Sequence, residues 1–183
     1  MLRTVQLLPL GSIDTEILGA AETAVARTFG FSVLRMAALP SPEYANDVMR
    51  RQYSSELILR SIIRTCPQDV WRLLAVTKED LFIPMLTFVY GQAQLNGKVS
   101  VVSYARLKQN FYGLKENPFL TQLRIQKEAI HELGHTFGLT HCRSYGCPMS
   151  LSTDVDQLDN KGSALCSNCT VLFRDFASVL HDE

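Results

Sequence analysis

Short apolar runs alternate with helix-like patterns in the first part of the chain. Three runs predict buried strands, at Val5 to Leu8, Phe31 to Leu39 and Trp71 to Thr77. Between them, apolar residues recur at helical spacing from Ile13 towards Gly30, and again from Tyr53 to Ile62. The order β-α-β-α-β favours a parallel sheet with right-handed crossovers.

The pattern changes in the middle of the chain. Two β-prone runs, Leu86 to Gln94 and Lys98 to Leu107, are joined by Leu95-Asn96-Gly97. Because Asn-Gly between such runs is a strong hairpin signal, we expect the first run to lie antiparallel to its neighbour in a mixed sheet. A helix is predicted to begin at Asn117-Pro118, where asparagine can cap it and proline fits the first turn. The last predicted helix covers roughly Thr170 to Leu180.

Length and composition suit one α/β domain. The chain has 183 residues, of which 46% are hydrophobic and 20% charged, as is ordinary for a globular protein. We expect a sheet-and-helix lobe over residues 1–138 and a cysteine-rich lobe with the last helix over residues 139–183. The 18 basic and 18 acidic residues cancel, so we expect no nucleic acid or anionic membrane as a partner. The chain is expected to be a monomer.

The sequence also bears on the compartment. It has no run of about 18 apolar residues, the length needed to span a bilayer. Its start, MLRTVQLLPLG, has only a short apolar run and no small-residue cleavage site, so we expect no signal peptide. The expected location is therefore the cytosol, where thiols stay reduced and clustered cysteines indicate a metal site more than disulfides.

A metal-binding pattern lies on the helix that begins at Asn117-Pro118. His131-Glu132-Leu133-Gly134-His135 has the form HExxH, and residues four apart on a helix face the same way. The two imidazoles can therefore share one zinc ion, at about 2.0–2.1 Å from each nitrogen. Glu132 would sit beside a zinc-bound water and act as its general base.

A third ligand requires the helix to end. Gly138 stands three residues after His135, and glycine tolerates the left-handed conformation that reverses a chain after a helix. We expect the reversal to bring His141 back to the metal and leave a fourth position open, as a catalytic zinc needs. Gly134 costs the helix about 1 kcal/mol relative to alanine, and we expect another segment to approach it closely.

The histidine pattern has to be compared with chance. HExxH alone occurs by chance in many proteins. Here three of the four histidines fall in one eleven-residue window, with a glycine at the expected bend, which favours zinc binding. The fourth, His181, is expected to be a solvated residue near the end of the last helix.

Four cysteines in two close pairs suit a second, closed metal site. Cys142 and Cys147 form one pair, and Cys166 and Cys169 form the other. Four thiolates can hold a structural zinc at about 2.3 Å, and such a site would fix the loop that carries the third histidine. Two alternatives stay open, namely two disulfides in an exported protein and a redox pair in the second CxxC. Cys66 is expected to be a lone buried thiol.

The combined motifs resemble one family. HELGHTFGLTHC contains the long metzincin signature HExxHxxGxxH. The cysteine that follows it, then Cys147-Pro148-Met149 and the distal CxxC, are similar to the archaemetzincins over residues 131–169. The 16 residues between Met149 and Cys166 are one fewer than is typical of that family.

The resemblance implies more than the spacing shows. It implies a metzincin-like mixed sheet, with catalytic zinc on His131, His135 and His141, Glu132 as base, and a second, structural zinc. The cysteines that would hold this second zinc are Cys142, Cys147, Cys166 and Cys169. It also implies that Met149 packs beneath the catalytic zinc, whereas without the family this methionine would be assigned to the core. The run at about Leu86 to Gln94 would rim the cleft and align a substrate by strand addition.

The expected reaction is hydrolysis of a peptide bond in a peptide or protein substrate, with zinc polarising the scissile carbonyl and Glu132 moving the proton. Tyr145 could steady the oxyanion, although a plain loop aromatic is the simpler interpretation. Two other functions remain open: a zinc-stabilised protein that binds peptides without cutting them, and a redox or chaperone-like protein acting through Cys166 and Cys169.

Overall fold

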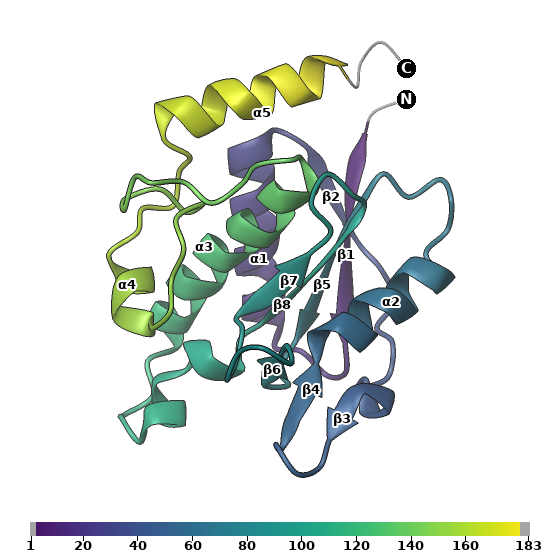
Figure 1. The fold of residues 1–183 in the computed structure, drawn as a ribbon, viewed down its shortest axis with the longest axis vertical. Helices are drawn as coiled ribbons and strands as arrows, with labels where there is room; N and C mark the ends of the chain where they lie inside the picture. The colour runs from purple at the N-terminus through teal and green to yellow at the C-terminus, as the bar shows by residue number, and fades with distance from the viewer. Residues whose placement is uncertain (1–2, 180–183) are drawn as a thin grey trace.

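A five-stranded mixed sheet forms the centre of the computed structural model, which describes residues 3–179 (Figure 1). The strands lie in the order β2-β1-β5-β8-β7. Four of them are parallel, and β7 pairs antiparallel with β8 at one edge. Their bounds are β1 Thr4–Leu10, β2 Ser32–Arg35, β5 Arg72–Thr77, β7 Gly91–Ala93 and β8 Val99–Ser103. The predicted mixed sheet with one antiparallel strand is confirmed.

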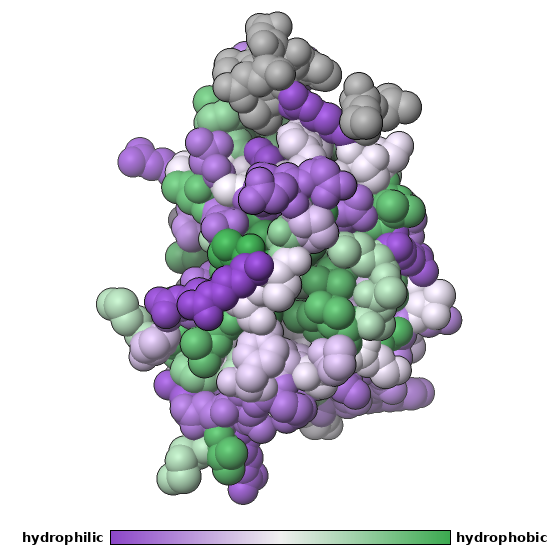
Figure 2. Space-filling model, turned by 90° about the vertical axis from the view of Figure 1, so that its right-hand side faces the viewer, coloured by the Kyte–Doolittle hydropathy of each residue, from purple (hydrophilic) through white to green (hydrophobic). Residues whose placement is uncertain are grey.

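Helices cover both faces of this sheet. On one face, α1 (Thr15–Phe29) and α3 (Pro118–Thr136) pack together against the strands, because both bury an apolar stripe there. On the other face lies α2 (Ser55–Thr65), whose buried residues include Ile58 and Ile62. Figure 2 shows the side on which α2 lies in Figure 1, where hydrophilic side chains surround an apolar area.

The helix ends follow the sequence signals. The Asn117 side chain accepts a hydrogen bond from the backbone N–H of Leu120, which caps α3 as predicted. Gly30 ends α1 with φ of 74°. The last helix, α5 (Ser167–Val179), begins three residues before the predicted Thr170, and Leu180 and His181 lie outside the described residues.

Two predicted strands are much shorter in the structure. Within Phe31 to Leu39 only β2 is a regular strand; beyond it, Met36 N–H and Leu39 N–H still bond to carbonyl oxygens of β1, and Leu39 forms a bridge to Leu10. Within Leu86 to Gln94 only β7 is a regular strand; Val89 forms an isolated antiparallel bridge to Leu81, and the side chains of Arg50 and Gln52 bind the carbonyl oxygens of residues 86 and 87. The predicted long rim strand is therefore wrong over its first half, where the chain forms a loop.

Several small elements carry no clear pattern in the sequence. A second sheet joins β3 (Asn46–Asp47), β4 (Gln52–Ser54) and β6 (Leu81–Phe82). The predicted strand Lys98 to Leu107 ends at Ser103 and continues into a 3₁₀ turn. The remaining elements are the 3₁₀ turns η1 Glu43–Ala45, η2 Ala105–Leu107 and η3 Gln109–Tyr112, and the short helix α4 Val155–Asp159. Among residues 3–179, no helix has both the length and the apolar character needed to cross a membrane.

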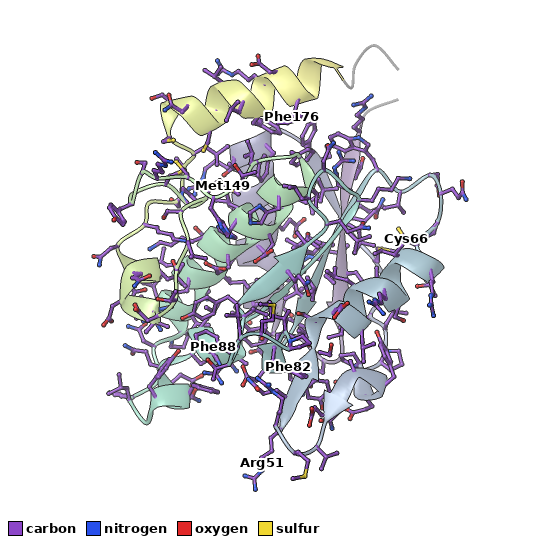
Figure 3. The ribbon with its side chains drawn as sticks, viewed as in Figure 1. Arg51, Cys66, Phe82, Phe88, Met149 and Phe176 are labelled. Carbon is purple, nitrogen blue, oxygen red and sulfur yellow. The ribbon has the colours of Figure 1, made fainter. Side chains whose placement is uncertain are left out.

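The end of α3 packs under α5. Gly138 has φ of 81°, and a Cβ atom built on it would lie 2.6 Å from Cζ of Phe176, a ring of α5 (Figure 3). The preceding residue, Phe137, is buried in an aromatic cluster with Phe29, Phe31, Trp71 and Phe173, in which ring centroids lie 4.6 to 6.0 Å apart. Glycine is therefore required at 138 for both its backbone conformation and its small size.

This packing predicts a stability difference between two glycine substitutions. Gly30→Ala forces a side chain into the left-handed region but meets no atom within 4 Å, and should cost about 1 kcal/mol. Gly138→Ala adds the overlap with Phe176 and should cost about 1 to 3 kcal/mol more. Urea unfolding of the two variants measures the difference, and equal losses would show that Phe176 does not fix this turn.

Candidate active site

Two histidines of α3 share one side of the helix. The Nε2 atoms of His131 and His135 lie 3.1 Å apart. His131 Nδ1 donates to the carbonyl oxygen of Pro148 at 2.8 Å, and His135 Nδ1 donates to that of Leu139 at 2.7 Å. Because a carbonyl oxygen can only accept, each Nδ1 carries the hydrogen and each Nε2 keeps its lone pair for a ligand.

The chain reversal after α3 brings the third histidine to the other two. Leu139 N–H bonds to the carbonyl oxygen of Gly134 at 3.1 Å, and Gly138 N–H bonds to that of His135 at 2.9 Å. This pair of bonds is a Schellman motif, which ends the helix through a left-handed residue. The His141 ring then lies 5.2 Å from that of His131 and 5.1 Å from that of His135, between centroids.

The three imidazoles fit a metal ion. One ring nitrogen from each lies within 4.8 Å of the others. A tetrahedral zinc separates two ligand nitrogens by about 3.3 Å, close to the 3.1 Å between the two Nε2 atoms of α3. Burial lowers the pKa of His131, His135 and His141, which favours the neutral imidazoles that a metal requires.

Glu132 lies next to this group and is buried, with 5% of its surface exposed. Its side chain packs against the rim strand, where a Cβ atom on Gly91 would lie 2.5 Å from Glu132 Cγ. Glycine at 91 therefore leaves the space that this carboxyl group occupies. Burial, and then the nearby carboxyl of Glu128, raise the pKa of Glu132, while the ammonium of Lys161 opposes the shift.

Glu128 and Lys161 form a second charged group beside Glu132. Both are buried, and Lys161 Nζ lies 3.9 Å from a carboxyl oxygen of Glu128. Burial raises the pKa of Glu128 to about 7, against the attraction of Lys161 and Lys127. Sequence reasoning missed both residues. Glu128 stands one helical turn before Glu132, a spacing that could have placed it on the same face, whereas Lys161 has no local signal.

Met149 lies beside the C-terminal half of α3, fully buried (Figure 3). A Cβ atom on Gly134 would lie 2.5 Å from Met149 Sδ, so the close approach expected at this glycine is confirmed, and Met149 makes it. The backbone carbonyl of Met149 accepts a hydrogen bond from Cys142 N–H at 2.9 Å. This bond joins the loop around Met149 to the residue that follows His141.

These residues open onto a cleft of about 670 Å³. One wall is the segment from residue 86 to 93, which includes β7, and the floor carries the histidines and the buried carboxyl groups. Leu151, Ser152 and Thr153 line it from the loop after Met149. Tyr145, a candidate for the oxyanion role, is 89% exposed and does not line this cleft.

The four paired cysteines converge at a separate point. Their sulfur atoms lie within 4.8 Å of one another, and Cys142 Sγ is 3.7 Å from Cys166 Sγ. This separation matches the distance of about 3.8 Å between two thiolates on a tetrahedral zinc and far exceeds a disulfide bond of about 2.05 Å. The backbone N–H of Cys169, in the first turn of α5, lowers the pKa of Cys166 to about 7. Cys66, expected to be buried, is partly exposed.

Comparison with known proteins identifies the family. The model of peptidase family M54 matches residues 47–175. An archaemetzincin of Methanocaldococcus jannaschii is 35% identical over 175 residues, which cover 96% of this chain and 95% of that protein. The chain belongs to the archaemetzincin family.

Solved archaemetzincin structures share the fold. The crystal structure of archaemetzincin from Methanopyrus kandleri superposes with a TM-score of 0.85 at 34% identity and covers 96% of each chain. The structure of a zinc-dependent peptidase from Methanocorpusculum labreanum superposes with a TM-score of 0.79 at 28% identity, and covers 92% of this chain and 99% of that one. Archaemetzincins are zinc metallopeptidases, so membership indicates a zinc-dependent peptidase at the level of the family.

The contact between Met149 and α3 predicts opposite outcomes for two helix glycines. Gly19→Ala in α1 meets only a guanidinium nitrogen of Arg35, at 3.5 Å, and should stabilise the protein by about 0.5 to 1 kcal/mol through helix propensity. Gly134→Ala gains the same propensity but displaces the Met149 sulfur, and should destabilise by about 1 to 3 kcal/mol. Urea unfolding distinguishes them. A stabilised Gly134→Ala variant would contradict tight packing at this contact.

Proposed function

We propose that this archaemetzincin hydrolyses peptide bonds in the cleft, with a catalytic zinc on His131, His135 and His141 and with Glu132 as general base. The observation that carries the proposal is the convergence of three imidazoles beside a buried carboxyl group in one cleft. Three protein ligands leave a fourth position for water and substrate, which is the pattern of catalytic rather than structural zinc sites.

The residues of this chain divide the chemistry among them. When bound, zinc supplies a Lewis acid for the scissile carbonyl and lowers the pKa of a water molecule. Glu132 takes the proton from the attacking water and passes it to the leaving amine. Pro148 and Leu139 hold the imidazoles of His131 and His135 through their carbonyl oxygens, so that both rings keep the same tautomer while the proton moves.

The rim strand can align a substrate. The carbonyl oxygen of Tyr90 accepts from Ser103 N–H at 2.7 Å, and Gln94 N–H donates to the carbonyl oxygen of Val99 at 3.0 Å, both across to β8. Because backbone groups alternate sides along an antiparallel strand, those of Gly91 and Ala93 face the open edge. We infer that an extended substrate adds to this edge, which is shorter than the stretch predicted from the sequence.

The cysteine cluster supports a second, structural zinc on Cys142, Cys147, Cys166 and Cys169. Cys142 directly follows His141, so fixing its sulfur also limits the movement of that histidine. The other pair anchors the start of α5, the helix that packs on Gly138. Reduced thiols at metal-binding distances suit the cytosol, which we propose as the location.

Replacing Glu132 tests the catalytic proposal. Glu132→Gln keeps the shape of the side chain but cannot accept a proton, so turnover of a peptide library should fall by about 10² to 10⁴ while bound zinc is unchanged. Metal analysis and cleavage rates measure the two effects, and Glu116→Gln, at an exposed carboxyl, should keep wild-type rates. Wild-type protein that holds zinc but cuts nothing across a broad library would favour a peptide-binding role.

Thiol titration tests the cysteine site. In native, zinc-loaded protein only Cys66 should react with an alkylating reagent, because the four clustered thiolates are bound. All five cysteines should react after chelation and unfolding. A Cys66→Ser variant should show no reactive thiol before the zinc is removed. Rapid reaction at Cys166 and Cys169 in the zinc-loaded protein would instead favour the redox function.

A further inference from the structure

A buried lysine reaches the turn that supports the histidine site. Lys161 follows α4, and only 1% of its side chain is exposed. Its Nζ donates to the carbonyl oxygen of Pro148 at 3.2 Å and to that of Ser150, the residues on either side of Met149. The carboxyl group of Glu128 lies 3.9 Å away. These oxygens surround the ammonium, so it is held inside the protein and is not directed to solvent.

One of these carbonyl groups is shared with a proposed metal ligand. The oxygen of Pro148 accepts from Lys161 Nζ and also from His131 Nδ1. A carbonyl oxygen has two lone pairs, so it can accept both bonds at once. The lysine and the histidine are therefore linked through a single backbone atom.

The two helical histidines differ in how their acceptors are held. His135 donates to Leu139, four residues on, and the Schellman turn of its own helix fixes that carbonyl. His131 donates to Pro148, 17 residues on, in a loop without helix or strand. Other bonds of this loop hold its neighbours: Cys142 N–H bonds to the carbonyl of Met149, and Ser150 N–H to that of Cys147. Among the described residues, the hydrogen bonds to the Pro148 carbonyl come from Lys161 and His131.

We propose that Lys161 is a positioning residue for His131: by fixing the carbonyl oxygen of Pro148, it holds the His131 imidazole in the Nδ1–H tautomer with Nε2 directed to the metal. The inference rests on the proposed zinc site for its consequence, but the link itself belongs to the metal-free protein. Partners of this kind around a metal site typically change metal affinity about 10- to 100-fold when they are removed.

The test removes the ammonium and keeps a flexible, unbranched side chain that is one heavy atom shorter. Lys161→Met removes the N–H donors, and a Lys161→Met/Glu128→Gln double variant also removes the carboxylate left without its partner. Both should bind zinc at the histidine site about 10- to 100-fold more weakly in competition with a chelator, with the cysteine site unchanged. NMR of the metal-free variants, labelled with ¹⁵N-histidine, measures the tautomer. The His131 imidazole should change from the Nδ1–H tautomer of the wild type to a mixture of the Nδ1–H and Nε2–H tautomers.

Lys127→Met is the matched control. Lys127 is also buried and donates to two backbone carbonyls, those of Leu158 at 3.0 Å and Asp159 at 2.8 Å, but none of its bonds reaches Pro148. The Lys127→Met variant should be less stable than the wild type. Its zinc affinity at the histidine site should stay within about twofold of the wild-type value, and His131 should keep the wild-type tautomer.

The outcomes separate the two proposals. Wild-type affinity and tautomer in the double variant, or an equal loss of affinity in Lys127→Met, would overturn the role of Lys161. Wild-type protein that binds zinc only among the cysteines would overturn the proposed function instead, and the tautomer of His131 in the metal-free protein would still decide the role of Lys161.

Discussion

The reversal of the chain after α3 is the constraint on which the site depends. Two histidines can be placed by a helix alone, because four residues make about one turn. The third must come from a chain that turns back at once, and Gly138 provides the left-handed conformation that does so. The same turn supplies the Leu139 carbonyl that orients His135, and Phe176 closes over it from α5. One short segment thus ends the helix, orients one histidine and delivers another.

The loop after the turn connects the two groups of metal-type donors. His141 and Cys142 are neighbours in the chain, and Met149 touches both regions, through its backbone to Cys142 and through its sulfur to Gly134. A loop with so little regular structure has little conformational stability of its own. The proposed structural zinc and the buried Lys161 would each restrict it, one at the thiols and the other at the backbone carbonyls.

Burial of charge is the second physical theme of the site. Glu128, Glu132 and Lys161 lie together with almost no exposed surface, although isolated charges are costly to remove from water. Lys161 limits this cost, since its ammonium faces carboxyl and carbonyl oxygens, whereas Glu128 opposes the ionisation of Glu132. The same low exposure raises the pKa of both carboxyl groups, so a buried carboxylate here is a stronger base than one in water.

The sequence by itself determined what depends on neighbours along the chain. The HExxH spacing, the asparagine cap of α3, the Asn-Gly hairpin and the glycine at the end of α3 are all local features, and the structure has the helix, the hairpin and the turn they predict. Only the tertiary structure decided which distant groups meet. Arg50 and Gln52 bind the loop before β7, Gly91 leaves room for Glu132, and Lys161 reaches Pro148. Periodicity records which face of an element is apolar, but it holds no information on which side chain from another element arrives there.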